Sequence, residues 1–234
     1  MQEDRYVDRL AASAAAAGFP LIVARKPRAW LDLNRSPAEI DPEMVAGMDP
    51  SQTSHISRKV RGGLGILPRR LHGAGNLWRE KWPHRHVMDR IEQDHEPYHI
   101  KIAHILAQMQ SVFGGALLLD LHSMPSVFDQ DRRQIGFVIG DRFGRSCDSR
   151  YAELAAVHFR RGGYHVQTNH PYSGGYILER HGKPARNVHA LQLEVDRALY
   201  LDESLREPTD AAGPISELIG NCCVMLADQL SGRF

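Results

Sequence analysis

The apolar positions of the chain form short continuous runs and longer segments in which apolar residues recur every three to four positions. Residues 116–122 and 135–140 are continuous apolar runs, which are typical of strands buried on both faces of a sheet. Residues 96–113 have helical spacing, and the two glycines that follow are expected to end this helix. The complete set of predicted helices is 3–18, 96–113, 151–161 and 211–230, and the predicted strands are 20–24, 29–33, 116–122, 135–140, 164–167 and 188–195.

Strands alternate with helices along much of this order, which predicts an α/β fold with a mostly parallel or mixed central sheet flanked by helices. No repeat or low-complexity linker divides the chain, so we expect a single domain over residues 1–234. Residues 41–96 are the least regular part. In the helix at 96–113, the residues predicted to share one side are Ile100, Ala103, His104, Ala107 and Met109. Tyr98 with His99 is predicted to form a cap and surface pair, and a role near the site is the alternative.

Composition narrows the class of protein. The chain has 29 Lys plus Arg and 28 Asp plus Glu, and this balance argues against nucleic-acid binding, which needs a basic face. The first residues are polar and the apolar run at 10–17 is too short to span a bilayer, so we expect neither a signal peptide nor a membrane partner. Three cysteines without a C-x-x-C pair fit no disulfide framework and no thiolate zinc site, and they favour a cytoplasmic protein.

Asp120 and His122 form the sharpest chemical pattern. Four apolar residues precede them, so they are expected at the carboxyl end of a buried strand, the edge where open α/β sheets bind ligands. Side chains alternate along a strand, and the two residues therefore share one face. The alternative is a strand that ends in a surface loop with polar residues of no function.

Two further groups have both a functional and a structural interpretation. Asn34 and Arg35 follow Asp32, and an amide beside a guanidinium fork suits a carboxylate ligand, although a surface Arg is the alternative. Gln192 and Glu194 share one face of an apolar strand, where a carboxylate is costly to bury unless it has a task or a partner. Proton transfer is one such task, and a buried salt bridge is the alternative.

These groups together supply an Arg and an Asn for a carboxylate, a His for a metal ion and a Glu for proton transfer. A zinc peptidase or amidase needs this combination of residues. Five stretches between residues 3 and 203 resemble the N-formylglutamate amidohydrolase family and follow one another in the family's order. They are AWLDLNR (29–35), DLHSMP (120–125), GDRFG (140–144), NHPYSGGY (169–176) and LQLEVDRALY (191–200).

The resemblance implies a fold like that of the zinc carboxypeptidases and succinylglutamate desuccinylases. It also implies zinc-dependent hydrolysis of a small N-acyl acidic amino acid, such as N-formyl-L-glutamate, which gives formate and glutamate. By the same resemblance, His122 is a zinc ligand, and Asn34 and Arg35 bind the substrate carboxylate. Glu194 is then the general base that activates water on zinc and protonates the leaving amine.

Two more residues receive roles from the resemblance. Arg28 is expected to contact the substrate or the oxyanion, and Asp4, in the first helix, is expected to be a second zinc ligand. The family opens with a strand that ends in Pro-His-Ser-Gly, which supplies another ligand, and the printed chain begins with the helix that follows. Three explanations stay open: an earlier start codon, a metal-free binding or scaffold protein, or a replacement ligand among His55, His84, His86, His95 and His99.

Overall fold

The computed structural model describes residues 3–48, 57–71 and 75–232. The chain divides into two compact units, and the boundary between them falls inside the long helix α5 (Glu96–Phe113). We call them the sheet unit, Asp4–Val23 with His104–Phe234, and the loop unit, Met1–Glu3 with Ala24–Ala103. Because the two units are defined by packing alone, the single family domain expected over residues 1–234 stays a prediction.

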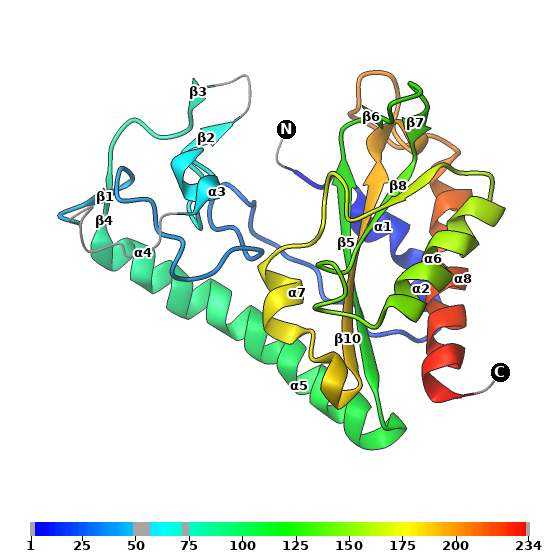
Figure 1. Ribbon diagram of the computed structural model, residues 1–234. Coiled ribbons are helices and arrows are strands. Elements are labelled where there is room, and N and C mark those ends of the chain that lie inside the picture. The colour runs from blue at the N-terminus through cyan, green and yellow to red at the C-terminus, as the bar shows by residue number, and fades with distance from the viewer. Residues whose placement is uncertain (1–2, 49–56, 72–74, 233–234) are drawn as a thin grey trace. The chain divides into compact units, whose positions relative to one another are not determined.

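A four-stranded mixed sheet forms the centre of the sheet unit (Figure 1). β5 (Ala116–Met124) lies parallel to β10 (Val188–Asp196), β10 is antiparallel to β8 (Phe137–Gly140), and β8 is parallel to β9 (Val166–Thr168). All nine residues of β10 are buried, as expected for a strand with a partner on each edge. The predicted α/β class and mixed sheet are confirmed.

Helices cover both faces of this sheet. Figure 1 shows α1 (Val7–Leu10), α2 (Ala12–Ala16), α6 (Ser149–Arg161) and α8 (Ala212–Ser231) on one side and α7 (Tyr176–His181) on the other. The first side holds the main apolar core, in which Leu191, Leu193 and Val195 of β10 join Phe159 of α6. Because side chains alternate along β10, Gln192 and Glu194 point to the opposite face, the one that α7 covers. The unit also contains β6 (Val127–Phe128), β7 (Gln134–Ile135), η3 (Pro184–Arg186) and η4 (Arg197–Leu199).

The loop unit has little regular structure before its helices. It contains β1 (Val45–Ala46), α3 (Arg58–Arg61), β2 (Arg70–Leu71), β3 (Gly75–Asn76), β4 (Trp82–Pro83), α4 (His84–Arg90), the π-helix η2 (Ile91–His95) and the first half of α5. A small apolar cluster forms around Leu31, Ile66 and Val87. The buried guanidinium of Arg90 lies over the rings of Trp30 at 3.5 Å and Trp82 at 4.0 Å, and this cation–π contact extends the cluster.

Several local predictions are wrong. Residues 20–24 and 29–33 form no strand: the first segment exposes Leu21 at 48% and Val23 at 36%, and the second consists largely of turns. Two apolar runs of this length cannot by themselves distinguish a strand from a loop that lies on an apolar surface. α7 was missed because it is short and follows Gly174 and Gly175, which indicate a turn.

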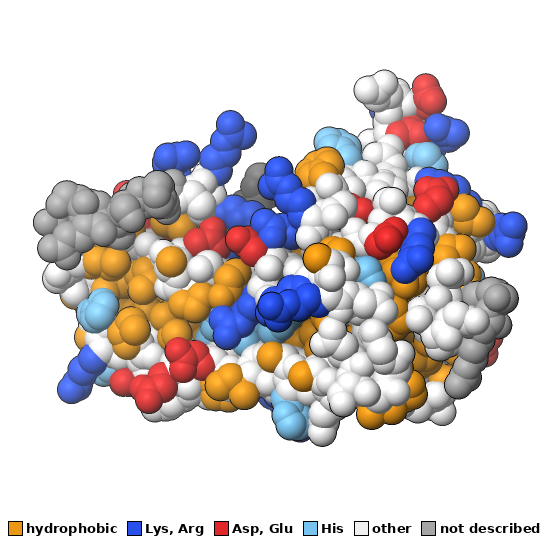
Figure 2. Space-filling model, turned by 60° about the horizontal axis from the view of Figure 1, so that its bottom comes forward, with side chains coloured by type: hydrophobic (Ala, Val, Ile, Leu, Met, Phe, Trp, Pro, Cys, Tyr) orange, Lys and Arg blue, Asp and Glu red, His pale blue; other side chains and the backbone are white. Residues whose placement is uncertain are grey.

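Helix α5 has the predicted bounds but not the predicted buried side. Ile100 is 62% exposed, and the buried side contains His99, Ile102 and Leu106 instead. His99 was predicted on the surface because histidine is usually partly exposed, and here it is fully buried. None of the described helices combines the length and apolar character that a membrane span requires. On the face shown in Figure 2, basic and acidic side chains are interspersed, in agreement with the balanced charge.

Candidate active site

The pairing of β5 with β10 brings four polar side chains together on the face that α7 covers. The register places Gln192 beside Asp120 and Glu194 beside His122, and paired residues of parallel strands point to the same side. Neighbouring strands lie about 4.8 Å apart, so these side chains are within contact distance. Asp120, Gln192 and Glu194 are each at least nine-tenths buried. The expected proximity of positions 122 and 194 is confirmed, and their chemical roles stay predictions.

The His122 imidazole lies between two carboxylates. Its Nδ1 is 3.0 Å from Asp4 Oδ2, and its Nε2 is 3.1 Å from Asp120 Oδ2. Burial alone would lower the pKa of His122, but the charges of Asp120 and Asp4 outweigh burial and raise this pKa well above its usual value. Without another cation beside the two carboxylates, the ring is therefore held as an imidazolium.

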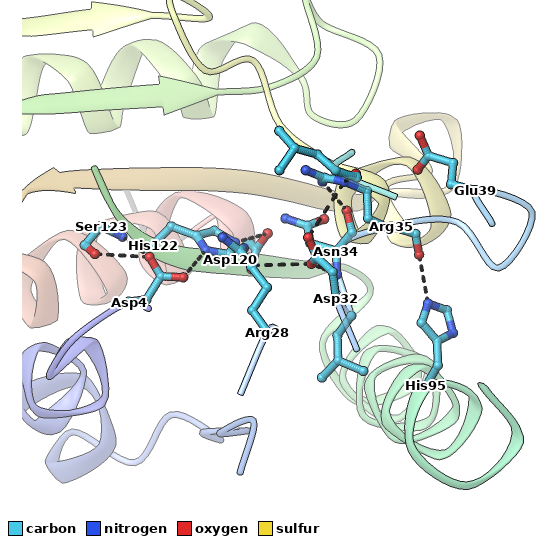
Figure 3. A network of polar contacts seen from close by, with 12 residues as sticks. Asp4, Arg28, Asp32, Asn34, Arg35, Glu39, His95, Asp120, His122 and Ser123 are labelled. Carbon is cyan, nitrogen blue, oxygen red and sulfur yellow. Dashed lines mark hydrogen bonds and ion pairs between the residues drawn. The ribbon is translucent and has the colours of Figure 1, made fainter. Parts of the chain in front are cut away.

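Asp4 is fixed by a chain of hydrogen bonds on its other oxygen. The backbone N–H and the hydroxyl of Ser123 donate to Asp4 Oδ1 at 2.8 and 3.1 Å (Figure 3). The buried Arg197 in turn donates from Nε to Ser123 Oγ at 3.0 Å and from Nη2 to the Ser123 carbonyl at 3.3 Å. Arg197 thereby orients the Asp4 carboxylate through Ser123.

Glu194 has a donor and a phenol near it. Gln192 Nε2 donates to Glu194 Oε1 at 2.7 Å, which fixes one carboxylate oxygen. Burial raises the pKa of the Tyr172 hydroxyl, and the charge of Glu194 raises it further, so the phenol stays protonated and can donate. Tyr172 lies within the stretch 169–176, which resembles the family, and the residue pattern assigned Tyr172 itself no role beyond the start of a turn.

His181 of α7 adds a neutral imidazole to this face. Burial lowers the pKa of His181 to about 4, assisted by the charges of Arg180 and Lys183, while Asp120 acts in the opposite direction. The same face thus contains one charged ring, His122, and one neutral ring, His181. Neither Tyr172 nor His181 was identified from the sequence. His181 lies in α7 and Tyr172 in the loop before it, and both reach this face only when these segments pack against β5 and β10.

The binding of zinc by Asp4 and His122 stays a prediction. Asp4 Oδ2 and His122 Nδ1 have nearly the separation of two ligands of one tetrahedral zinc ion, about 3.3 Å. Asp120 on the second nitrogen resembles the carboxylate that commonly orients a histidine ligand. Catalytic zinc takes three protein ligands, however, and no group of three or more His, Cys, Asp or Glu side chains within the described ranges could hold a metal ion.

The replacement ligands considered from the sequence have other surroundings. His95 and His99 are directed by Nε2 toward backbone carbonyls, as described below. His84 is exposed on α4, and His86 lies against the Trp82 ring. His55 lies outside the described residues. None of these contacts identifies a third ligand.

In the loop unit, Asp32 organises the residues expected to bind a carboxylate. Its Oδ1 accepts a hydrogen bond from the backbone N–H of Asn34 at 2.9 Å, which closes a tight turn. Arg28 Nε lies 3.4 Å from Oδ1, and Arg35 Nε lies 3.7 Å from Oδ2. The structure therefore gathers Arg28, Asn34 and Arg35 around one buried carboxylate, and their binding of a substrate stays a prediction.

A cavity of about 760 Å³ opens in the sheet unit beside the β6–β7 hairpin. Its walls include Asp129, Arg133 and His170, and none of Asp4, His122 or Glu194 lines it. Its volume would suit a small ligand. We place the chemistry at His122 and Glu194 nonetheless, because the buried groups able to transfer a proton or bind a metal gather there.

Comparisons with known proteins point to one family. Residues 1–201 match the family described as N-formylglutamate amidohydrolase. The N-formylglutamate deformylase of Pseudomonas aeruginosa is 32% identical over 207 residues, which cover 86% of this chain and 71% of that protein. The enzyme of the same name from Pseudomonas putida is 30% identical over 208 residues, with the same coverage.

A solved structure extends the likeness to the fold. The crystal structure of N-formylglutamate amidohydrolase from Ralstonia eutropha JMP134 matches with a TM-score of 0.89 at 28% identity, and the match covers 99% of this chain and 85% of that chain. The family match alone includes every predicted site residue, from Asp4 to Glu194. The chain belongs to the N-formylglutamate amidohydrolase family.

Proposed function

We propose that this protein hydrolyses the amide bond of N-formyl-L-glutamate, or of a closely related N-acyl acidic amino acid. The observation that carries the proposal is the pairing of Glu194 with His122 on one buried face of a chain from this family. The names of the relatives supply the substrate. In the reaction, water forms a C–O bond with the formyl carbon, the C–N bond breaks, and formate and glutamate leave.

Glu194 is the proposed proton carrier. It takes a proton from the attacking water and delivers it to the nitrogen of the departing amine, which balances the reaction without another acid. The bond from Gln192 Nε2 to Oε1 orients the Glu194 carboxylate for this transfer. Burial supports this role because a carboxylate inside an apolar strand is costly unless it has a task or a partner.

The loop unit supplies the proposed contacts with the carboxylates of the substrate. Arg35 and Asn34 bind a carboxylate, and Arg28 binds a carboxylate or the oxyanion. A guanidinium suits these tasks because its planar N–H donors match two carboxylate oxygens. Asp32 supports the proposal, since it fixes the turn that presents Asn34 and Arg35.

Zinc is the proposed cofactor. Asp4 and His122 would be two of its ligands, with Asp120 orienting the ring and Ser123 orienting the carboxylate. Zinc, when bound, lowers the pKa of water and polarises a carbonyl. A cation between Asp4 and His122 would also take over the charge that the imidazolium now supplies.

Replacement of Glu194 by Gln tests the reaction. We expect kcat for N-formyl-L-glutamate to fall by roughly 10³-fold, within the range for loss of a general base, while zinc content stays that of the wild type. Glu153→Gln is the matched control, because Glu153 is exposed on α6 and pairs only with Arg160 among the residues described. Full turnover by the Glu194→Gln variant would overturn the assignment.

A metal-free binding or scaffold protein is the second candidate, and the lack of a three-ligand group among the described residues favours it. Metal analysis of the purified protein distinguishes the two functions. Near-stoichiometric zinc, with activity lost on chelation and restored by Zn²⁺, supports the enzyme. A protein that stays without zinc after zinc is supplied, and does not hydrolyse the substrate, supports the scaffold.

A further inference from the structure

Two buried histidines of the loop unit bond to the loop that carries Asn34 and Arg35. His95 ends the π-helix η2, and His99 lies one turn later in α5, so both rings share one side of the helix. Both residues are 0% exposed, and their ring centroids are 4.3 Å apart. π-helical turns are uncommon and frequently mark functional sites.

Each ring is directed at a backbone carbonyl. His95 Nε2 lies 2.9 Å from the carbonyl oxygen of Arg35, and His99 Nε2 lies 3.0 Å from that of Leu33 (Figure 3 shows the His95 contact). A carbonyl oxygen can only accept a hydrogen bond, so Nε2 carries the proton in both rings. The two bonds fix the Leu33–Asn34 and Arg35–Ser36 peptide groups, which flank the Asn34–Arg35 pair.

The same loop has no strand partner to fix it. Its other contacts include the bond from the Asp32 N–H to the Ile66 carbonyl at 2.8 Å, the bond from the Asn34 N–H to Asp32, and the ion pairs of Arg28 and Arg35 with Asp32. The Arg35 side chain also makes two hydrogen bonds, Nε to the Leu64 carbonyl at 3.0 Å and Nη1 to the Asn34 carbonyl at 2.8 Å. Neither Arg35 contact uses Nη2. The direction of the guanidinium therefore depends in part on the Asn34 carbonyl, whose peptide group lies between the two that the imidazoles bond.

We propose that His95 and His99 are positioning residues that set the affinity of Asn34 and Arg35 for a carboxylate of the N-acyl amino acid. The inference rests on the proposed function, because it requires Asn34 and Arg35 to bind that carboxylate. Loss of either Nε2–H donor frees a peptide group of the loop and misdirects both side chains. Binding of the anionic substrate weakens as a result, whereas proton transfer by Glu194 does not require either imidazole.

Steady-state kinetics of the full chain with N-formyl-L-glutamate test this inference. His99→Phe keeps a ring but removes the donor, and we expect KM to rise about tenfold, the effect of one lost hydrogen bond in a buried site, with kcat within about threefold. His99→Gln keeps an N–H donor at a similar reach and should hold KM within about threefold of the wild type. His104→Ala, an exposed change on α5, is the control.

The preference of the enzyme among related substrates gives a second readout, which a general loss of rigidity in the protein would not change. N-Formylglutamine and N-formylisoglutamine each lack one carboxylate of the substrate. We expect His99→Phe to lose about tenfold of the preference for N-formylglutamate over one of these amides. In the Arg35→Ala variant, adding His99→Phe should change this preference by less than about twofold, because His99 acts through the loop that carries Arg35.

The outcomes separate this inference from the function on which it rests. A zinc-loaded wild type that does not hydrolyse N-formylglutamate overturns the proposed function and the inference with it. An active wild type whose His99→Phe and His99→Gln variants bind substrate equally well overturns the inference alone, as does a fall in kcat at unchanged KM. His95→Phe and His95→Gln repeat the comparison if circular dichroism shows that a His99 variant does not fold.

Discussion

The two units of this chain are stabilised in different ways. In the sheet unit, β10 is paired on both edges and buried along its whole length, and an apolar core fills the space between the sheet, α6 and α8. In the loop unit, every strand has two residues, and specific polar contacts supplement a small apolar cluster. Arg90 over the tryptophans and the two histidines on the Asp32–Arg35 loop are such contacts.

This difference affects how each unit presents its functional groups. Strand alternation and register place Glu194 beside His122, and they depend on many equivalent backbone bonds. Individual side chains place Asn34 and Arg35, and no repeated pattern would compensate for the loss of one. We therefore expect apolar truncations to affect the sheet unit most and polar substitutions to affect the loop unit most.

The largest expected effect is on the core of the sheet unit. Phe159 is 0% exposed and stacks on Phe137 with ring centroids 4.3 Å apart. Phe159→Ala should lower the free energy of unfolding by about 4 kcal/mol, because it removes a buried ring and leaves a cavity. Chemical denaturation measures this. Phe143→Ala, at a residue 73% exposed, is the control and should change stability by less than about 0.5 kcal/mol.

The same difference explains which parts of the fold could be predicted from the sequence. β5, β10, α5 and α8 have long hydrophobic patterns, and their predicted bounds lie within about two residues of those observed. The strand pattern also placed Asp120 with His122 on one face of one strand and Gln192 with Glu194 on one face of another, and the register then makes the two pairs neighbours. These predictions succeeded because local spacing determines them.

Predictions failed where long-range packing decides the structure. The segment 29–33 resembles a strand, but it consists largely of turns, and contacts of Asp32 and of the Leu33 carbonyl with Asn34 and His99 fix its end. His99 is buried because its ring has a carbonyl partner 66 positions away. Ser123, Arg197 and His181 acquire their neighbours only when β5, η4 and α7 come together, and no local pattern indicates this.

A buried ion pair tests the polar character of the loop unit. Arg69 Nε lies 2.9 Å from the buried Asp41 Oδ2, and its Nη1 lies 2.7 Å from Glu43. Arg69→Met should lower the free energy of unfolding by about 3 kcal/mol, because it leaves the Asp41 charge buried without its guanidinium. The exposed Arg58→Met is the control. Equal stability of both variants would contradict the view that polar contacts stabilise this unit.

The third prediction concerns pH and the polar face of the sheet unit. Burial lowers the pKa of His181 to about 4, so the unfolded chain takes up a proton near pH 6.5 and the folded chain does not. This contribution to stability is complete above pH 6.5 and is lost as the pH falls toward 4, by about 3 kcal/mol. His181→Gln should remove that part of the pH dependence in urea titrations. His104→Gln, at an exposed position, should keep it.

The smallest expected effects come from matched helix caps, one in each unit. Asp148 accepts a hydrogen bond from the Arg150 N–H at the start of α6, and Ser57 accepts one from the Val60 N–H at the start of α3. Asp148→Ala should cost about 1 kcal/mol, the usual value of a cap. Ser57→Ala should cost more, because the hydroxyl also donates to Glu39 at 2.7 Å and Glu39 holds the Ser36 N–H.

Free energies of unfolding for the two cap variants, measured side by side, sharpen the comparison between the units. A helix of 13 residues packed on a sheet has many other stabilising contacts, whereas α3 has four residues and depends on its cap and on Glu39. If Asp148→Ala lowered the free energy of unfolding more than Ser57→Ala, the contribution of a cap to stability would rise with the length of its helix. The loop unit would then depend less on single polar contacts than its hydrogen bonds indicate.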